Sequence, residues 1–394
     1  MKITYTSTNI AWHFRYASEL HRLGHLHAFV TGASRFSLRG TGEEFGERLV
    51  RRDLAQNLYL ASLKARLPNK ISETLNRWSN AAIDRAAYQS AKESEVFFFY
   101  RTTGLATTRR LHREKAATFC VMEEVNSHVD CCHELMKQEY EKLGIGSYAD
   151  RFPDHEARLV AYEEADAIVC PSSFVRRSFL ERGFPEQKLL TVNFGFTFPE
   201  TAAADPEQRD RDVFRLLYVG QINFRKGLRY ALDAFGKLKH PRKEFLVVGP
   251  TTAITGLENV TIPEGVRFAG ILKGAKLEAA YASATAFVLP TVEEGLALVQ
   301  GEAMAAGLPL ITTTHSGGDD IMQDGVEGFI VPPADGGALL EAFQKLADSP
   351  ELSQKMGEAA LARAKQLGGW DVAARNLVDA LSGAREQGLK SLAA

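Results

Sequence analysis

The sequence has little cysteine and no long apolar run. Four cysteines among 394 residues are too few for a disulfide scaffold, so we expect a reduced, cytoplasmic protein. The first six residues lack the apolar core of a signal peptide. The apolar run Val96–Tyr100 is far shorter than the ~18 residues of a membrane span. We therefore expect a soluble protein that contacts a membrane at most from one side.

Common nucleotide and metal motifs are also missing. There is no G-x-x-x-x-G-K-[ST] run, no G-x-G-x-x-G after a strand and no H-E-x-x-H, which disfavours a P-loop NTPase, a dinucleotide dehydrogenase and a zinc protease. Asp210-Arg211-Asp212 is formally a D-x-D motif, but it lies in a polar stretch that we interpret as a solvated linker. His128, Cys131, Cys132 and His133 are close in sequence, but adjacent cysteines on a helix point apart. Two buried cysteines explain this cluster better than zinc, and we expect no metal and no cofactor.

The overall charge is nearly balanced, but its distribution is not. Lys and Arg number 47 and Asp and Glu 49, so the net charge of −2 gives no reason to expect nucleic-acid binding. Residues 1–120 nevertheless hold 19 basic against 10 acidic residues. Leucines interleave with the basic residues over 48–67, which suggests docking on an anionic membrane; a solvated, Arg-rich helical insertion is the alternative. The basic residues are Arg48, Arg51, Arg52, Lys64, Arg66, Arg109, Arg110 and Arg113.

Short apolar runs alternate with amphipathic helical segments along most of the chain. This alternation predicts an α/β protein with two doubly wound, Rossmann-like domains that face a cleft. Residues 35–92 differ, because they are polar and largely helical without a clear strand. The expected units are a first domain (1–198), a linker (199–212), a second domain (213–369), and a terminal helix over 371–381 within a tail (370–394) whose end is frayed. Strands are expected at 3–6, 26–30, 96–100, 118–122, 167–170, 189–194, 216–219, 245–248, 266–268, 286–289, 308–312 and 329–331.

Two loops that follow strands of the second domain carry charged residues. The adjacent cations Arg225 and Lys226 stand at a helix start, which suggests an anion site, although exposed cations would look the same. The second loop carries Glu294 and Gly295, and Glu302 lies in the early turns of the helix that follows. Helix-start amides can hold a phosphate while carboxylates accept hydrogen bonds from hydroxyl groups. The combination fits a sugar nucleotide.

At these residues the chain resembles the retaining glycosyltransferases of glycosyltransferase family 4. The spacing of Glu294 and Glu302 matches the family's E-x7-E within EGLALVQGEAMAAGLPLITT, and the likeness continues through Gly317-Gly318 to VPPAD. EEADAIVCPSSFVRRSFLERGFPEQKL is similar to the family's last strand and helix of the first domain. The resemblance covers most of residues 160–382 and is weaker over 1–150. It implies the GT-B fold, in which a helix, here opened by Trp370-Asp371, crosses back to the first domain.

The resemblance also implies roles for individual residues. Arg225 and Lys226 would neutralise the donor diphosphate, Glu302 would hold the ribose, Glu294 would bind the transferred sugar, and the base would lie near residues 268–272. His128 corresponds to the family's sugar-contacting histidine; a surface histidine at a helix start is the alternative. The expected catalytic residues are His128, Glu294 and Lys226; the donor-binding residues are Gly220, Gln221, Arg225, Lys226, Phe268, Ile271, Glu294, Gly295, Leu296, Ala297, Leu298, Val299 and Glu302; and the acceptor-binding residues are Trp12, His13, Arg101, Asn126 and His128.

Two departures from the family pattern concern the phosphate contacts. Gln221 stands where members often carry arginine, and Arg225 is expected to compensate. The glycine-rich loop after the first strand is replaced by Thr8–His13, so Trp12 and His13 are assigned to the acceptor site instead.

The predicted activity is metal-independent transfer of a sugar from a nucleoside-diphosphate sugar to a hydroxyl group of a sugar or lipid-linked acceptor. The expected context is the synthesis of cell-surface polysaccharide, lipopolysaccharide or glycolipid. A sugar-nucleotide epimerase or hydrolase of the same fold is an alternative that needs no acceptor site. A non-catalytic nucleotide-sugar-binding protein is another, and the pairing of the two carboxylates with Arg225 and Lys226 argues against it.

Overall fold

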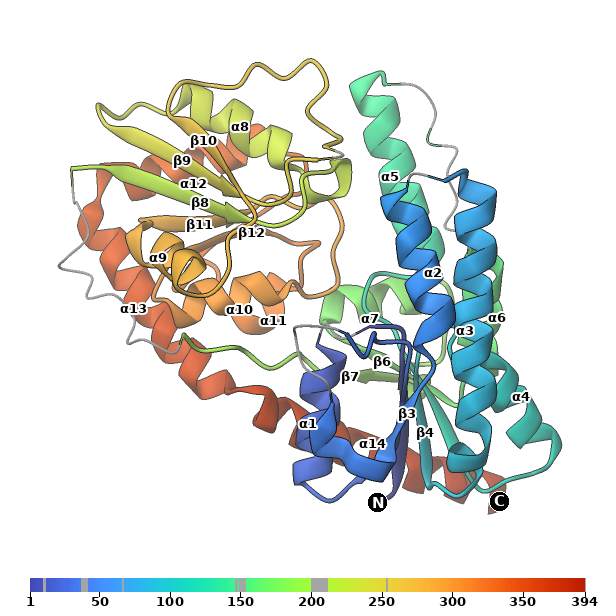
Figure 1. The fold of residues 1–394 in the computed structure, drawn as a ribbon. Helices are drawn as coiled ribbons and strands as arrows, with labels where there is room; N and C mark the ends of the chain where they lie inside the picture. Colours follow the sequence, from blue (N-terminus) through green and yellow to red (C-terminus); the bar gives the residue numbers. More distant parts are fainter. Residues whose placement is uncertain are drawn as a thin grey trace.

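The computed structural model describes residues 1–9, 12–36, 42–65, 67–145, 148, 154–199, 212–252 and 254–393. They form two parallel sheets, each covered by helices on both faces (Figure 1). The predicted linker 199–212, including Asp210 and Arg211, lies almost entirely outside the described residues. The α/β class and the two-sheet architecture predicted from the alternating pattern are confirmed.

The first sheet has seven strands in the order β3-β2-β1-β4-β5-β6-β7. The central strands are apolar because helices cover both of their faces; in β4 (Val96–Tyr100), four of the five residues are buried. The strand order reverses between β1 and β4, and ligands of such sheets bind beyond the carboxyl ends of the strands at this point. The other strands are β1 (Ile3–Ser7), β2 (Leu26–Thr31), β3 (Leu49–Arg51), β5 (Phe119–Glu123), β6 (Ala167–Cys170) and β7 (Leu189–Thr191).

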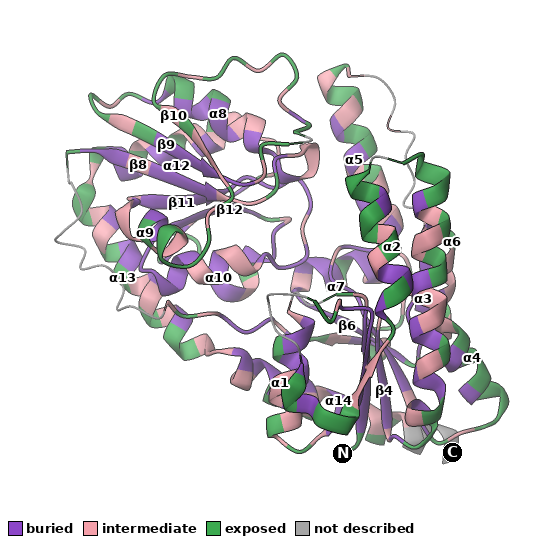
Figure 2. Ribbon diagram, viewed as in Figure 1, coloured by how far each residue is buried: buried purple, intermediate pink, exposed green. Residues whose placement is uncertain are grey.

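The second sheet has six strands in the order β10-β9-β8-β11-β12-β13. Its order reverses between β8 (Phe214–Val219) and β11 (Ala286–Leu289), the two strands that precede the charged loops. The buried strands of both sheets form the core of each domain (Figure 2). The remaining strands are β9 (Lys243–Val248), β10 (Val266–Gly270), β12 (Leu310–Thr313) and β13 (Gly328–Val331).

Helices flank the sheets and end the chain. Those around the first sheet are α1 (His13–Arg22), α2 (Asp53–Lys64), α3 (Asn69–Lys92), α4 (Leu105–Arg113), α5 (Val129–Leu143), α6 (His155–Glu164) and α7 (Ser173–Leu180), with short 3-10 helices η1 (Glu43–Arg48) and η2 (Glu186–Lys188). Those around the second are η4 (Phe224–Lys226), α8 (Leu228–Lys237), α9 (Ala275–Ser283), α10 (Leu298–Ala305), α11 (Gly318–Ile321), α12 (Gly336–Asp348) and α13 (Pro350–Leu367).

The last helix, α14 (Trp370–Ala393), returns to the first domain (Figure 1). Leu377 and Leu381 are fully buried where it packs, and α1 is a main contact. Arg385 forms an ion pair with Glu95 at 2.9 Å, and this contact fixes the C-terminal part of α14 beside the first sheet. The predicted crossing is therefore confirmed, but the prediction of a frayed end after residue 381 is wrong, since the helix continues to Ala393.

The two chain segments that join the domains lie side by side. Phe196 and Gly369 form a parallel bridge, and a Cβ on Gly195 would overlap the backbone of Trp370. Within the described part of the chain, no helix combines the length and apolar character needed to cross a membrane.

Candidate functional site

The site is centred on a cluster of charges at the carboxyl ends of β8 and β11. The side chain of Asn223 accepts a hydrogen bond from the Lys226 amide at 3.1 Å and so begins the short helix η4. Gly227 follows with φ +63°, and a Cβ there would overlap the carbonyl oxygen of Pro290, so the close approach of the two loops requires glycine. This approach brings Arg225 and Lys226 to Glu294, as the sequence predicts.

Glu294 forms ion pairs with both cations. Its Oε2 accepts from Arg225 Nη1 at 3.0 Å and from Lys226 Nζ. Burial alone would raise the pKa of Glu294, but the charges of Arg225 and Lys226 outweigh burial and lower this pKa to about 2. Burial lowers the pKa of Lys226, although Glu294 partly offsets it. A dense, partly enclosed group of charges therefore lies at the switch point of the second sheet.

The start of α10 lies beside this cluster. Its N-cap is Ala297, whose side chain makes no capping bond, so no side chain of the N-cap residue satisfies the amides at this helix start. Glu302, one turn further, accepts a hydrogen bond from the Tyr281 hydroxyl at 3.0 Å, and burial raises its pKa. Leu296, Leu298 and Val299, which were assigned to the donor site from the sequence, belong to the same segment.

The other predicted donor-binding residues have different surroundings. Gly220 packs beneath the Tyr218 hydroxyl, which donates to the carbonyl oxygen of Gln221 at 2.5 Å. Ile271 follows β10 and is 64% exposed, whereas Phe268 within β10 is half-buried. Ile271 therefore presents an exposed apolar side chain just beyond the carboxyl end of β10.

The first domain contributes a buried hydrogen-bonded group from its own switch point. The His13 Nδ1 atom lies 2.5 Å from the Tyr5 hydroxyl and 3.3 Å from Glu123. Trp12 Nε1 donates to the other Glu123 oxygen at 3.0 Å. His13 is fully buried and lies beneath the surface of the first domain. The side chain of Trp12 is partly exposed.

Arg101 and Asn126 are joined in a second network. Arg101 donates to Asn126 Oδ1 at 2.8 Å and to Glu124 at 3.3 Å, and Glu124 also accepts from Arg158 at 2.8 Å. Burial would raise the pKa of Glu124, but Arg158 and Arg101 lower it to about 2. Its fixed negative charge orients the loop that holds Asn126 toward the second domain.

His128 is the N-cap residue of α5, directly after Ser127, and its side chain is buried. Its ring packs against Tyr162, Phe179 and Phe184, and its side chain is 3% exposed. Nδ1 caps α5 by accepting from the Asp130 amide, while burial, aided by Arg182, lowers the pKa of His128 to about 4. The ring is enclosed by aromatic side chains and the histidine caps α5, so His128 is not the surface histidine that the sequence offered as the alternative. Its contact with the transferred sugar stays a prediction.

The sequence interpretation overlooked Glu293. This carboxylate is fully buried and accepts from the Ser127 amide at 2.9 Å, from the Ser127 hydroxyl at 2.8 Å and from Arg225 at 3.3 Å. It therefore joins both domains at the site. The sequence shows two consecutive glutamates before a glycine. The partner of the first glutamate is Ser127, which is distant in the sequence and is brought to Glu293 only by the tertiary fold.

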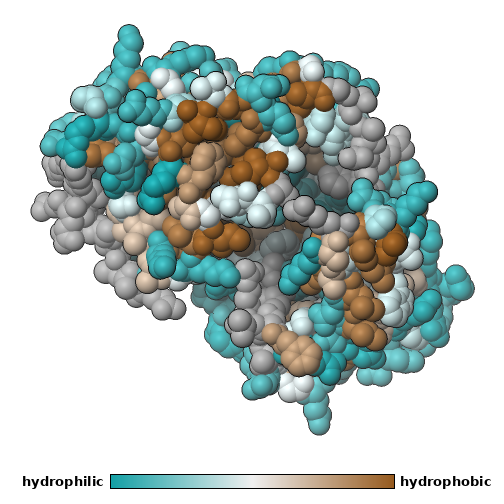
Figure 3. Space-filling model, turned by 45° about the horizontal axis from the view of Figure 1, so that its top comes forward, coloured by the Kyte–Doolittle hydropathy of each residue, from teal (hydrophilic) through white to brown (hydrophobic). Residues whose placement is uncertain are grey.

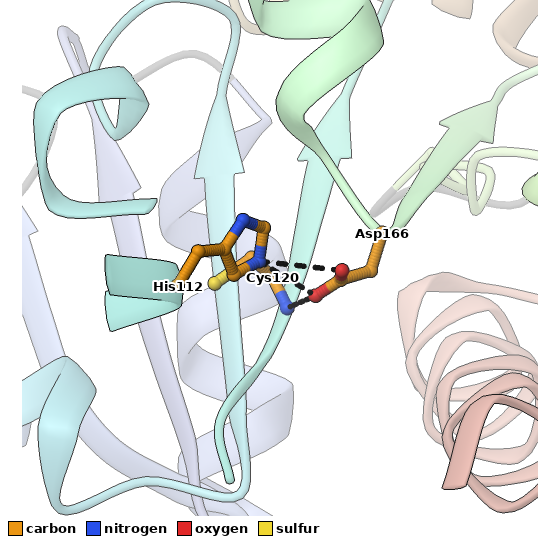
Figure 4. A group of neighbouring side chains, drawn as sticks. All are labelled: His112, Cys120 and Asp166. Atoms are coloured by element: carbon orange, nitrogen blue, oxygen red, sulfur yellow. Dashed lines mark hydrogen bonds and ion pairs between the residues drawn. The ribbon is translucent and has the colours of Figure 1, made fainter. Parts of the chain in front are cut away.

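A separate group of potential metal ligands lies at the amino ends of β5 and β6 in the first sheet. His112, Cys120 and Asp166 place one ligand atom each within 4.8 Å of one another (Figure 4). Asp166 already accepts from the Cys120 amide at 2.7 Å and contacts His112 at 3.3 Å, contacts that hold the start of β5. Among the predicted cysteine cluster, Cys132 is buried as expected, but Cys131 is only partly buried.

Comparison with known protein families finds a match for most of the second domain. Residues 213–349 match the family described as "Glycosyl transferases group 1". A sulfoquinovosyl transferase of Arabidopsis thaliana is 33% identical over 214 residues, covering 50% of this chain and 41% of the relative. A D-inositol 3-phosphate glycosyltransferase of Streptomyces avermitilis is 30% identical over 253 residues, covering 58% and 52%. The chain thus spans about half the length of the curated relatives it matches.

Solved structures share the fold over nearly the whole chain. A sucrose-phosphate synthase from Thermosynechococcus elongatus matches with a TM-score of 0.70 and 18% identity, covering 97% of this chain and 98% of that one. HepE of Anabaena, solved in complex with UDP-glucose, matches with a TM-score of 0.66 and 15% identity, covering 97% and 100%. These likenesses confirm the predicted GT-B fold.

Proposed function

Because residues 213–349 belong to the group 1 glycosyltransferases, we propose that the chain transfers a sugar from a nucleoside-diphosphate sugar to a hydroxyl acceptor between its two domains. The observation that carries the proposal is the cluster of Arg225, Lys226 and Glu294 beside the start of α10. Cations and helix-start amides at the switch point of a parallel sheet suit a diphosphate. The structural neighbour HepE was solved with UDP-glucose, which supports a donor of this class.

Each residue of the cluster has a chemical task in this proposal. Arg225 and Lys226 bind the diphosphate, and their charges stabilise the negative charge that develops as it leaves. Glu294 accepts hydrogen bonds from hydroxyl groups of the transferred sugar. Glu302, held by Tyr281, accepts from the ribose hydroxyls. The exposed Ile271 and the neighbouring Phe268 contact the base.

The proposed reaction retains the configuration of the sugar and needs no metal. The acceptor attacks from the side on which the phosphate leaves, and the phosphate oxygen takes the acceptor proton. Two fixed cations supply the positive charge that a divalent metal provides in other phosphate transfers. Addition of EDTA should accordingly leave the rate of transfer unchanged.

The donor is tested by thermal shift with UDP-, GDP- and ADP-sugars, since a bound donor stabilises the folded state by mass action. Glu294→Ala and Lys226→Ala should each reduce transfer at least a hundredfold while the circular dichroism spectrum stays unchanged. Lys237→Ala is the matched control, because Lys237 is an exposed cation paired with Asp233 away from the site. Wild-type rates in both site variants would refute the assignment. Release of free sugar without transfer would favour a hydrolase.

We also propose that the acceptor is lipid-linked and that the first domain docks on an anionic membrane. The helices α2 and α3 pack together and carry apolar side chains that are 42–67% exposed. Figure 3 shows hydrophobic side chains on this domain among hydrophilic ones, beside the hollow between the domains. The apolar residues are Leu54, Leu58, Leu60, Leu63, Leu67, Ile71 and Trp78, and the exposed cations next to them are Arg48, Arg52, Lys64, Lys70 and Arg77.

The predicted basic group divides in the structure. Arg109 pairs with Glu164, and Arg110 pairs with Glu114 over the ring of Tyr88, so these arginines of α4 are engaged within the domain. Arg66 lies outside the described residues. The proposed membrane face is therefore restricted to α2 and the first half of α3, where exposed apolar and basic side chains occur together. The helix η1 is left out because it carries three exposed glutamates, Glu43, Glu44 and Glu47.

Vesicle binding tests this face. The protein should co-sediment with phosphatidylglycerol vesicles at low salt and less so with phosphatidylcholine vesicles, because both the apolar and the basic side chains contribute. Leu54→Glu combined with Leu58→Glu should weaken binding at least tenfold. Ile262→Glu is the control, because Ile262 is an apolar position of the second domain that is about as exposed as Leu58. Failure of the wild type to bind anionic vesicles would end the membrane proposal and leave the donor site untouched.

A further inference from the structure

We propose that Glu293 is a positioning residue that holds the two domains in register during transfer, without itself determining donor affinity. The inference rests on the proposed function for its kinetic consequence and on geometry for the contact itself. Glu293 lies in the loop after β11, between the donor-side cluster of the second domain and the loop after β5 in the first.

The contacts of Glu293 divide between the domains. Toward the first domain, Oε1 accepts from both the amide and the hydroxyl of Ser127, at 2.9 and 2.8 Å, and Oε2 lies 3.4 Å from Asn126 Nδ2. Toward the second domain, Oε2 accepts from Arg225 at 3.3 Å. A fully buried carboxylate is costly unless it is paired, so these partners must be present together. Separation of the domains would remove those of the first domain at once.

Arg225 has other partners within its own domain. Its Nη1 also donates to the carbonyl oxygen of Glu293 at 2.9 Å and to Glu294 at 3.0 Å, and its carbonyl oxygen accepts from the Thr291 hydroxyl at 2.9 Å. Loss of the Glu293 carboxylate therefore leaves Arg225 in place for the diphosphate. Loss of the same carboxylate removes the two Ser127 bonds and frees the loop after β5.

The loop that Ser127 belongs to is itself fixed to the core of the first domain. Glu124 accepts from the amides of Val125 and Asn126 at 2.9 and 3.2 Å and is bound to Arg158 and Arg101. A continuous series of bonds thus leads from the buried Arg158 through Glu124, Arg101 and Asn126 to Glu293. Through it, Glu293 sets the position of the acceptor-side surface relative to the donor.

Three variants separate this role from a general loss of stability. Glu293→Ala should reduce kcat at least tenfold and change the affinity for UDP, GDP or ADP, whichever binds the wild type in calorimetry, less than twofold. Glu293→Gln keeps an oxygen for Ser127 and should retain more of kcat than the alanine variant. Ser127→Ala removes one bond and should reduce kcat about threefold. Glu327→Ala is the control, since this buried carboxylate binds the Gln323 amide within the second domain.

Small-angle scattering supplies a readout that does not need turnover. Glu293→Ala should raise the radius of gyration, and Glu327→Ala should not. A fall in diphosphate affinity equal to the fall in kcat, or an unchanged kcat and radius in Glu293→Ala, would overturn the inference. If the wild type turns over no nucleotide sugar but Glu293→Ala still expands, the proposed function fails while the domain contact stands.

Discussion

At the scale of single residues, His128 and Glu293 show what tertiary contacts add to a motif. The sequence singled out His128 itself, whereas Glu293 lies beside the predicted Glu294, and in each case partners distant in the chain fix the surroundings of the side chain. Phe179 and Tyr162 enclose the histidine, and Ser127 binds the glutamate. By contrast, the cluster of Arg225, Lys226 and Glu294 was predictable, because helix starts and glycine turns within two short segments bring these residues together.

The buried ring of His128 makes stability depend on pH. Burial lowers its pKa to about 4 in the folded protein, while an unfolded histidine titrates near ~6.5. Between these values the unfolded chain binds a proton that the folded chain does not, so this contribution to stability is complete above pH ~6.5 and is lost as the pH falls toward 4. His128→Asn keeps an N-cap acceptor and does not titrate.

We expect the free energy of unfolding in urea to fall between pH 7.5 and pH 5 by roughly 1–2 kcal/mol more in the wild type than in His128→Asn. The lost ring contacts lower the free energy of unfolding of His128→Asn by the same amount at both pH values. The difference between the two pH values therefore reports only the titration of the histidine. Equal falls in both proteins would show that the histidine is protonated freely in the folded state.

At the scale of elements, the apolar runs predicted nearly every strand to within two residues. There are two exceptions. The strand predicted at 189–194 ends three residues earlier, since β7 is Leu189–Thr191. The strand β3 was not predicted, because three residues within an Arg-rich segment give no detectable alternation and are held as a strand by pairing with β2. The sequence predicted helix α14 at the correct position, but the predicted helix is too short. Its final turns have few apolar residues, and contacts such as Gly388 against Phe119 and Arg385 with Glu95 keep it helical.

The packing of α14 against α1 predicts the effect of a core substitution. Leu377 is fully buried in α14, so Leu377→Ala should lower the free energy of unfolding by about 2–5 kcal/mol through lost burial and the cavity that remains. Asp379→Ala, at an exposed position of the same helix, should change it by less than ~0.5 kcal/mol. The check is urea unfolding followed by circular dichroism, and a small effect of Leu377→Ala would mean that α14 is loosely docked.

At the scale of the whole molecule, the domains meet through backbone as well as side chains. A Cβ on Gly295 would overlap the carbonyl oxygen of Val125 in the first domain, and the Ser172 hydroxyl donates to the Gly295 carbonyl oxygen at 2.7 Å. Ser173 donates from its amide and hydroxyl to Asp320, both at 2.9 Å. The described arrangement therefore leaves no room for a side chain at Gly295.

Gly295→Ala should hold the domains apart. We expect a larger radius of gyration in small-angle scattering, a strong loss of transfer, and a melting temperature within a few degrees of the wild type, because each domain keeps its own core. Gly383→Ala is the control, since an added Cβ there would meet no atom within 4 Å. An unchanged radius in Gly295→Ala would show that the contact with Val125 adjusts locally.

The return of α14 to the first domain also bears on how the chain is made. During synthesis the seven strands of the first sheet emerge before the second domain, yet the surface of α1 that buries Leu377 and Leu381 stays uncovered until residues 370–393 have left the ribosome. The second domain, which needs only residues 213–369, can complete its core earlier. The domain that begins first is thus completed last, and the nascent chain exposes the apolar surface that α14 later covers for as long as translation of the second domain takes.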